Sequence, residues 1–204
     1  MNSKNKILAS IRKQPVREIS LPDSTGFGIR YEDPLGQFEN MLEQVGGVAL
    51  RVADQTQIAE TLESIEVYRS AKWVLSGVPG VQRDNSDAAP VDDPYALEQL
   101  DVAVLAGEFM VAENGAIWVS GEHVKHRVVY VIAEHLILVV DAQQIVHNLH
   151  EAYDRLSFEQ VQYGLFISGP SKTADIAATL VTGAQGARSL HVLLVGPPPA
   201  TPER

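Results

Sequence analysis

Residues 48–75, VALRVADQTQIAETLESIEVYRSAKWVL, contain one complete strand–helix–strand unit. The apolar start Val48–Val52 predicts a short buried strand, and residues 73–75 predict a second one. Between them Asp54 stands at the N-cap of a helix whose apolar residues recur every three or four positions, at Ile58, Leu62 and Ile65. Two strands joined by a helix pair in parallel, so this stretch predicts a βαβ unit.

The same alternation continues on both sides of this unit. Asp33-Pro34 and Asp93-Pro94 each combine an N-cap with a proline at the first helical position. Further strands are expected at the apolar runs 102–105, 136–140, 165–168 and 190–195, and further helices at 143–156 and 171–181. Residues 109–111 and 116–119 flank an Asn-Gly turn, which predicts antiparallel pairing. We therefore expect the α/β class: a three-layer α/β/α sandwich with a mainly parallel sheet.

The chain ends differ in character from this domain, which spans residues 33–196. Residues 1–32 predict an N-terminal helix and a linker, since Ile7, Leu8 and Ile11 recur at helical spacing above a basic outer face. That helix either docks at the domain edge or binds a partner. Residues 197–204 are rich in proline and are expected to be a disordered tail.

Composition excludes several classes of protein. The 204 residues are 45% hydrophobic, and 16 Lys+Arg against 26 Asp+Glu give a net charge of −10, which argues against nucleic acid or anionic membranes as partners. No cysteine is present, so disulfides, cysteine-ligated clusters and thiol nucleophiles are excluded. The longest apolar stretch, residues 128–140, falls short of the about 20 residues that a membrane span needs. We expect a soluble, cytoplasmic protein.

The first candidate site is the stretch Val111-Ala112-Glu113-Asn114-Gly115-Ala116-Ile117. A carboxylate between two apolar runs is costly to bury, and such groups often serve a reaction. Glu113 could act as a base or as a covalent nucleophile toward an activated acyl group, while Gly115 would let a substrate approach the backbone. The alternative is a hairpin turn with a solvated Glu113.

The second candidate site is the loop Ser168-Gly169-Pro170-Ser171-Lys172-Thr173-Ala174-Asp175, which follows an apolar run and precedes a predicted helix. The start of a helix presents free backbone N–H groups and the positive end of the dipole. Hydroxyls and Lys172 would add further donors for a phosphate or a carboxylate. The spacing is not that of a Walker A motif. An ordinary N-cap, with Ser171 capping and Asp175 complementing the dipole, is the alternative.

The histidines give weaker signals. His147 with His150, and His123 with His126, lie three residues apart, but no H-E-x-x-H motif is present, so no metal site is expected. His135 interrupts an apolar run directly before a strand and is a weaker addition to a binding site.

Together these segments resemble the LUD-domain family, of the lactate utilization protein C type. The resemblance rests on residues 112–116, on Glu134-His135-Leu136-Ile137, on the 167–176 block ISGPSKTADI, and on a closing loop at 183–187 followed by an apolar strand. It implies the three-layer fold of the sugar-phosphate isomerase and CoA-transferase superfamily. Residues 112–115 also look like the S-E-N-G stretch of CoA transferases, in which the glutamate forms an acyl thioester. The chain departs from the family pattern at Ala177, Gln185 and Ala187.

The resemblance implies a component of a bacterial L-lactate utilization system, which oxidises lactate to pyruvate with iron–sulfur partner proteins. We expect this chain to hold no redox centre or cofactor of its own and to bind a small anionic ligand, a CoA- or phosphate-like anion. The predicted site combines Glu113, Asn114, Gly115 and His135 with Ser168, Gly169, Ser171, Lys172, Thr173 and Asp175, around a shared cleft. The alternatives are an enzyme acting on a CoA ester or a sugar phosphate through Glu113, and a ligand-binding sensor.

Overall fold

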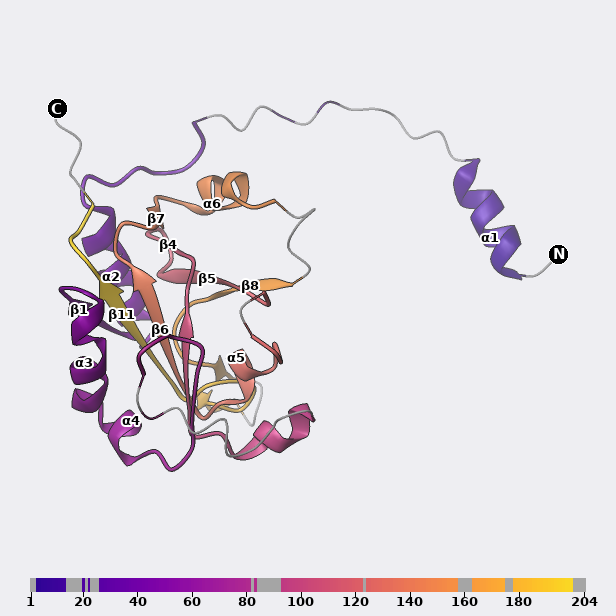
Figure 1. Cartoon of the computed structure of the whole chain (residues 1–204). Helices are drawn as coiled ribbons and strands as arrows, with labels where there is room; N and C mark the ends of the chain where they lie inside the picture. Colours follow the sequence, from indigo (N-terminus) through magenta and orange to yellow (C-terminus); the bar gives the residue numbers. More distant parts are fainter. Residues whose placement is uncertain are drawn as a thin grey trace.

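A five-stranded parallel sheet forms the centre of the molecule (Figure 1). The computed structural model describes residues 3–13, 20, 22, 26–81, 83, 93–122, 124–157, 163–174 and 178–199. In the order in which they lie side by side, the strands are β1 (Val48–Val52), β11 (Ser189–Val195), β6 (His135–Asp141), β3 (Val102–Ala106) and β2 (Val74–Ser76). Every neighbouring pair in this sheet is parallel. The predicted α/β class and mainly parallel sheet are confirmed.

Helices cover one face of this sheet. The 3-10 turn η1 (Gln55–Gln57) leads into α3 (Ile58–Ser64) and α4 (Glu66–Ser70). Their apolar side chains, Ile58 and Leu62 among them, form one buried cluster with Val102 and Val104 of β3. The intervening Ala103 and Leu105 point to the opposite face, as strand alternation requires. Both faces of the parallel sheet are therefore buried, which explains its continuous apolar runs.

The opposite face is covered by helices and by a second sheet. Helix α2 (Pro34–Gln44), the 3-10 turn η3 (Pro94–Gln99) and the short helix α5 (Val129–Ile132) contribute to one large cluster. The second sheet has the order β7 (Ile145–Val146), β4 (Phe109–Val111), β5 (Ala116–Ser120) and β8 (Gly164–Ile167). The pairing of β4 with β5 is antiparallel, as predicted from the Asn-Gly turn. Met110 and Ile117 of this hairpin pack into the same cluster.

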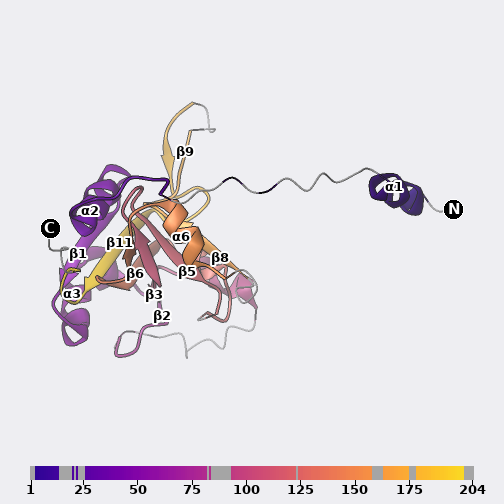
Figure 2. The ribbon, with the colours of Figure 1, turned by 90° about the horizontal axis from the view of Figure 1, so that it is seen from above.

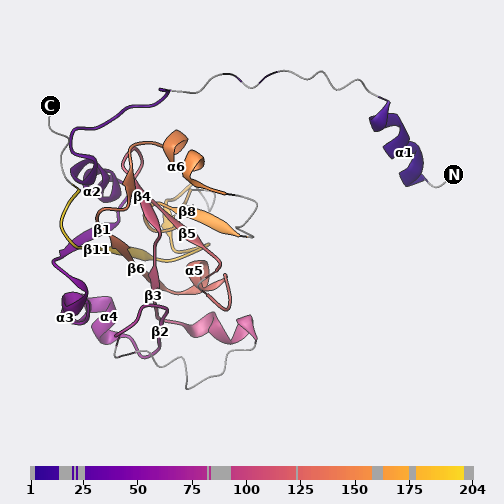
Figure 3. The same cartoon turned by 45° about the horizontal axis from the view of Figure 1, so that its top comes forward.

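Helix α6 (Leu149–Arg155) lies on the outer face of the second sheet (Figure 3). Its Ala152 is fully buried and packs with Phe109 and Trp118. The flanking layer on this side is thus part helix and part sheet, with α6 outside it. This second sheet is an addition to the three layers that the sequence predicts.

Two helix predictions need correction. The helix expected at 143–156 is shorter, because residues 145–146 form β7 and α6 begins only at Leu149. The helix expected at 171–181 is wrong: Lys172–Thr173 forms β9, Val181–Thr182 forms β10, and the two pair antiparallel (Figure 2). Ser171 N donates to Ala187 O and Gly183 N donates to Ser171 O, so this backbone bonds across to the closing loop rather than to itself.

The N-terminal helix α1 spans Ser3–Arg12, as predicted, and none of its residues is buried. In Figure 1 it lies apart from the two sheets. Within the described ranges, no helix is long and apolar enough to cross a membrane.

Candidate functional site

The Asn-Gly turn between β4 and β5 packs directly against helix α2. Gly115 has φ +65°, and a Cβ placed there would lie 2.7 Å from the backbone nitrogen of Leu42. Asn114 folds back on the turn, because its Oδ1 accepts a hydrogen bond from Ala116 N at 3.1 Å. Glycine is therefore required here by the approach of α2, and no ligand is needed to explain it.

Glu113 is exposed and occupied in a local contact. Its Oε2 accepts a hydrogen bond from Leu149 N at 2.9 Å, at the start of α6. Its own backbone N donates to His147 O at 3.1 Å. A carboxylate near the first turn of a helix satisfies a free N–H group and complements the dipole. The structure thus gives Glu113 a solvated, helix-capping position, which corresponds to the plainer of the two interpretations of this turn.

The second loop contacts the first. Ser168 Oγ donates to Asn114 O at 2.7 Å, which joins two segments that are 54 residues apart in the sequence. Gly169 has φ +71°, and a Cβ there would lie 2.7 Å from Val45 O. Lys172 Nζ donates to that same Val45 O at 2.7 Å. Both loops therefore surround the C-terminal end of α2.

This geometry differs from the predicted anion cradle. No helix begins at Ser171, so the cluster of free N–H groups expected there is missing, and Ser171 N itself donates to Ala187 O. The ammonium of Lys172 donates a hydrogen bond to a backbone carbonyl at the C-terminal end of α2, where the helix dipole favours a cation. Thr173 lies in β9 opposite Val181. Asp175, which the sequence places in the same site, is outside the described residues.

The closing loop joins this cluster. A mostly apolar cavity of about 200 Å³ lies between β8, α5 and the loop, and its lining includes Gly169, Ser171, Gln185 and Gly186. Ala187 also lines it and is nearly buried in the main core. Two of the departures from the family pattern, Gln185 and Ala187, therefore stand beside the second candidate loop. The third, Ala177, lies outside the described residues. Glu113 is not among the residues that line this cavity.

His135 lies on the other face of the sheet from the Asn-Gly turn. It begins β6, at the amino end of the parallel sheet, and its Nδ1 lies 2.8 Å from Ser189 Oγ. Strand alternation puts it on the face covered by α3 and α4, whereas the Asn-Gly turn packs on α2 on the opposite face. Burial lowers the pKa of His135, with a smaller opposing effect from Glu134. The prediction that it shares a site with Glu113 finds no support in this placement.

His123 lies outside the described residues, and two other histidines have structural contacts. His147 Nδ1 accepts a hydrogen bond from Tyr31 N at 3.1 Å, and His150 packs on the Phe27 ring. Burial lowers the pKa of His191, whose Nδ1 has no hydrogen-bond partner. In the part of the chain that the structure describes, no three such side chains are grouped to hold a metal ion.

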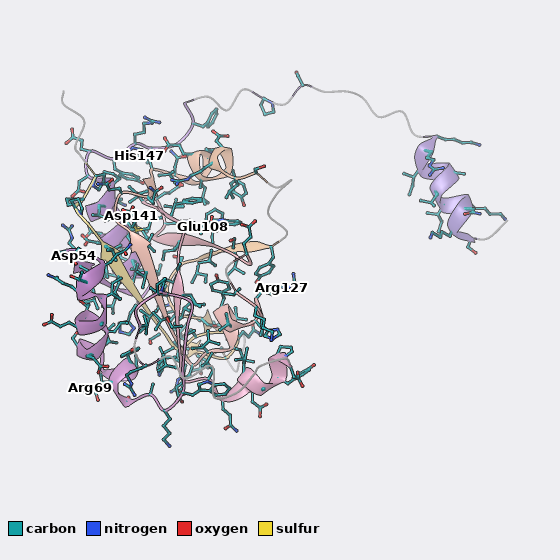
Figure 4. All side chains as sticks on the ribbon, in the orientation of Figure 1. Asp54, Arg69, Glu108, Arg127, Asp141 and His147 are labelled. Atoms are coloured by element: carbon teal, nitrogen blue, oxygen red, sulfur yellow. The ribbon has the colours of Figure 1, made fainter. Side chains whose placement is uncertain are left out.

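Sequence reasoning missed the larger cavity. A chamber of about 580 Å³ opens at the carboxyl ends of the parallel strands, bordered by residues at or just beyond the ends of β1, β2, β3, β6 and β11. Its polar lining consists of Asp54, Gln55, Asp141 and Gln143, and its apolar lining includes Ile58 and Val139. Figure 4 shows Asp54 and Asp141 at the same end of the molecule. Ligand sites of parallel α/β sheets gather at this edge.

The two carboxylates of this chamber have local partners. Asp54 Oδ1 accepts a hydrogen bond from Thr56 N at 2.8 Å, and the Thr56 hydroxyl and backbone together hold the pKa of Asp54 below its usual value. Asp141 Oδ1 accepts from Gln143 N at 2.9 Å. One signal in the sequence pointed here: an aspartate stands at or just beyond the end of two predicted strands. Only the strand order brings those ends together.

Comparison with known proteins fits this fold and these motifs. The model of the LUD domain family matches residues 95–195. The lactate utilization protein C of Geobacillus thermodenitrificans is 28% identical over 173 residues, covering 78% of this chain and 68% of that protein. The protein of the same name from Bacillus pumilus is 27% identical over 117 residues, covering 54% and 49%. Residues 95–195 of this chain are thus identified as a LUD domain.

A solved structure shows the same fold. The crystal structure of a DUF162 family protein from Deinococcus radiodurans superimposes with a TM-score of 0.56 at 18% identity, covering 80% of this chain and 96% of that chain. The matched stretch spans about half of the Bacillus pumilus protein and about two thirds of the Geobacillus one.

Proposed function

We propose that this chain is a component of a bacterial L-lactate utilization system that works with iron–sulfur partner proteins and carries no redox centre itself. One observation carries this proposal: the chain has the LUD fold and aligns, at 27–28% identity over 117 and 173 residues, with relatives that are named lactate utilization protein C. The absence of cysteine supports a redox centre outside this chain, because a cysteine-ligated cluster would have to lie in a partner.

Growth of a deletion strain tests the role in lactate use. Without the gene, the host is expected to grow on pyruvate but not on L-lactate as sole carbon source, and the gene supplied in trans restores growth. Pyruvate is the control, because it lies after the oxidation step. Normal growth on lactate in a host without a second copy of the gene would refute the proposal. For the partners, the tagged chain from lactate-grown cells should co-purify proteins with the visible absorbance of iron–sulfur clusters.

We further propose that a small anion binds where the Ser168 loop meets the Asn114 turn. The hydroxyl of Ser171 and the ammonium of Lys172 are the donors that support this placement. Lys172 now contacts Val45 O, so binding would require the ammonium to turn from the end of α2 toward the ligand.

Thermal unfolding with L-lactate, pyruvate, inorganic phosphate and CoA tests the anion. A ligand present at 100 times its dissociation constant stabilises by about 2.7 kcal/mol. Lys172→Ala should abolish that increment, whereas Lys72→Ala, an exposed lysine ahead of β2, should leave it unchanged. An unchanged melting temperature with all four compounds would refute the anion site and leave the growth test unaffected.

The alternative of a CoA-transferase-like reaction through Glu113 stays a prediction. The contact of its carboxylate with Leu149 N supports a capping role instead. Incubation with acyl-CoA followed by trapping with hydroxylamine or borohydride would reveal an acyl thioester as a mass change at Glu113.

A further inference from the structure

Helix α1 has the composition of a docking element. Its eleven-residue region 3–13 contains four basic and no acidic side chains, and because the whole chain carries −10, the other residues carry −14. Three apolar residues form a stripe along it: Ile7 and Ile11 are each 60% exposed, and Leu8 is 39% exposed. At 100° per residue, Arg12 borders this stripe next to Leu8, and Lys4 lies in line with the stripe at its N-terminal end.

Such a helix needs a surface to pack on. A ten-residue helix is marginal in water on its own, because the cost of nucleation is spread over few hydrogen bonds. Amphipathic helices in proteins are stabilised chiefly by packing of their apolar face. The matching surface should therefore combine apolar walls with negative charge at its border.

The chamber at the carboxyl edge of the parallel sheet has that chemistry. Its walls include Ile58, Val78, Val139 and Val195, and Asp54 and Asp141 stand among its polar residues. No lysine, arginine or histidine occurs among its described lining residues. An anionic ligand would find no cation there. A helix face that is both apolar and basic would match the apolar walls and the two aspartates of the chamber.

The connection between helix and chamber is long enough. Gly28 is anchored beside Asn148, which follows Gln143 of the chamber by five residues, so the anchor lies within about 18 Å of the chamber along the chain. The thirteen residues from 13 to 26 can span up to about 45 Å. The helix can thus reach the chamber of its own chain. Because residues 13–26 link the two, the effective concentration of the helix at the chamber is millimolar.

We propose that α1 docks across the chamber of its own chain, with the stripe of Ile7, Leu8 and Ile11 against the apolar walls and its basic border beside Asp54 and Asp141. The proposal does not depend on the role in lactate use. It predicts that the chamber is covered in the resting chain.

Disulfide trapping in the full-length protein tests this arrangement. The chain has no cysteine, so two introduced thiols are unique. The test pair is Ser10→Cys with Gln143→Cys. Gln143 is exposed, and its backbone donates to Asp141 Oδ1 and accepts from Ile145 N, so both bonds survive the substitution. The control pair is Ser10→Cys with Lys72→Cys, an exposed position ahead of β2 at the opposite edge of the sheet. Both are oxidised mildly and followed by intact mass and by migration on a denaturing gel.

The test pair should form an intramolecular disulfide at least about tenfold faster than the control pair, at a rate independent of protein concentration. Adding Ile7→Glu and Ile11→Glu should reduce the rate to that of the control, and folding is unaffected because α1 has no buried residue. Equal rates for the two pairs would overturn the proposal. Trapping that yields only dimers would also overturn it and would assign α1 to the chamber of a second copy.

Discussion

Gly115 allows the β4–β5 turn to pack against helix α2. Its φ of +65° and the 2.7 Å approach of a Cβ to Leu42 N both oppose any side chain. Gly115→Ala should therefore destabilise the protein by about 2 kcal/mol or more, measured by urea unfolding. Gly80→Ala is the matched control, since Gly80 has φ +83° but nothing within 4 Å of a Cβ. Equal losses for the two variants would show that the contact with α2 contributes nothing.

Substitutions of Glu113 distinguish a helix-capping role of its carboxylate from a catalytic role. Glu113→Ala removes the acceptor for Leu149 N, which should cost about 0.5–2 kcal/mol of stability, while growth on lactate continues. Glu113→Gln keeps an oxygen acceptor and should recover most of the stability. Urea unfolding and the growth assay measure the two effects. Loss of growth with Glu113→Gln at unchanged stability would contradict the capping role and restore the catalytic hypothesis.

Two half-buried histidines, His135 and His191, make stability depend on pH. Burial lowers the pKa of both His135 and His191 below 6.5, so between the lowered values and 6.5 the unfolded chain binds more protons than the folded one. Their contribution is fully present above pH 6.5, and stability is lost as the pH falls through 6.5 toward the lowered values. Urea unfolding at pH 7.5 and 5.5 should show this loss, and His191→Gln should reduce it. Equal stability at the two pH values would contradict the prediction.

At the scale of elements, Asn148 ties α6 to the segment before α2. Its Oδ1 accepts from Glu151 N at 3.0 Å as the N-cap, and its Nδ2 donates to Ile29 O at 3.3 Å. Asn148→Ala should cost about 1–2 kcal/mol, because a buried cap is lost. Asn148→Asp keeps the cap and loses only the donor, so it should be the milder variant in urea unfolding. If both variants cost the same, the contact with Ile29 dominates instead.

Most helices and strands were predictable from short sequence motifs, because the interactions that begin and end them are made by neighbouring residues. The aspartates at 33, 54 and 93 cap the elements that follow them, each through its own side chain. The helix at 171–181 failed because its backbone groups bond to residues 183 and 187, which no local pattern reveals. Thr173, Val181 and Thr182 are β-branched residues that favour the strands actually formed.

The site was predictable only where it is built from contiguous motifs. The meeting of the Ser168 loop with the Asn114 turn was expected, and a 2.7 Å hydrogen bond joins them. The exposure of Glu113 was one of two interpretations of its turn, and the sequence could not decide between them because its contact depends on where α6 begins. The carboxyl-edge chamber requires β11 to lie between β1 and β6, and such a non-local order has no signature in a single sequence.

At the scale of the whole molecule, two sheets share one core. Met110 and Ile117 of the second sheet pack in the same cluster as Leu136 and Leu138 of the first. By contrast, strands β9 and β10 have two residues each, and their side chains are exposed or only partly buried. The molecule should therefore unfold cooperatively through its core while this pair opens on its own.

Native-state hydrogen exchange measures that contrast. Strand β6 is paired on both sides, with β11 and β3, and Leu138 is fully buried, so its amide should exchange only through global unfolding, with a free energy equal to that from urea. Val192, the β11 residue opposite Leu138, should behave alike. The amides of Thr173 and Val181 should exchange with little protection, because local opening exposes no apolar core. Protection of Val181 equal to that of Leu138 would mean that the β9–β10 pair belongs to the cooperative core.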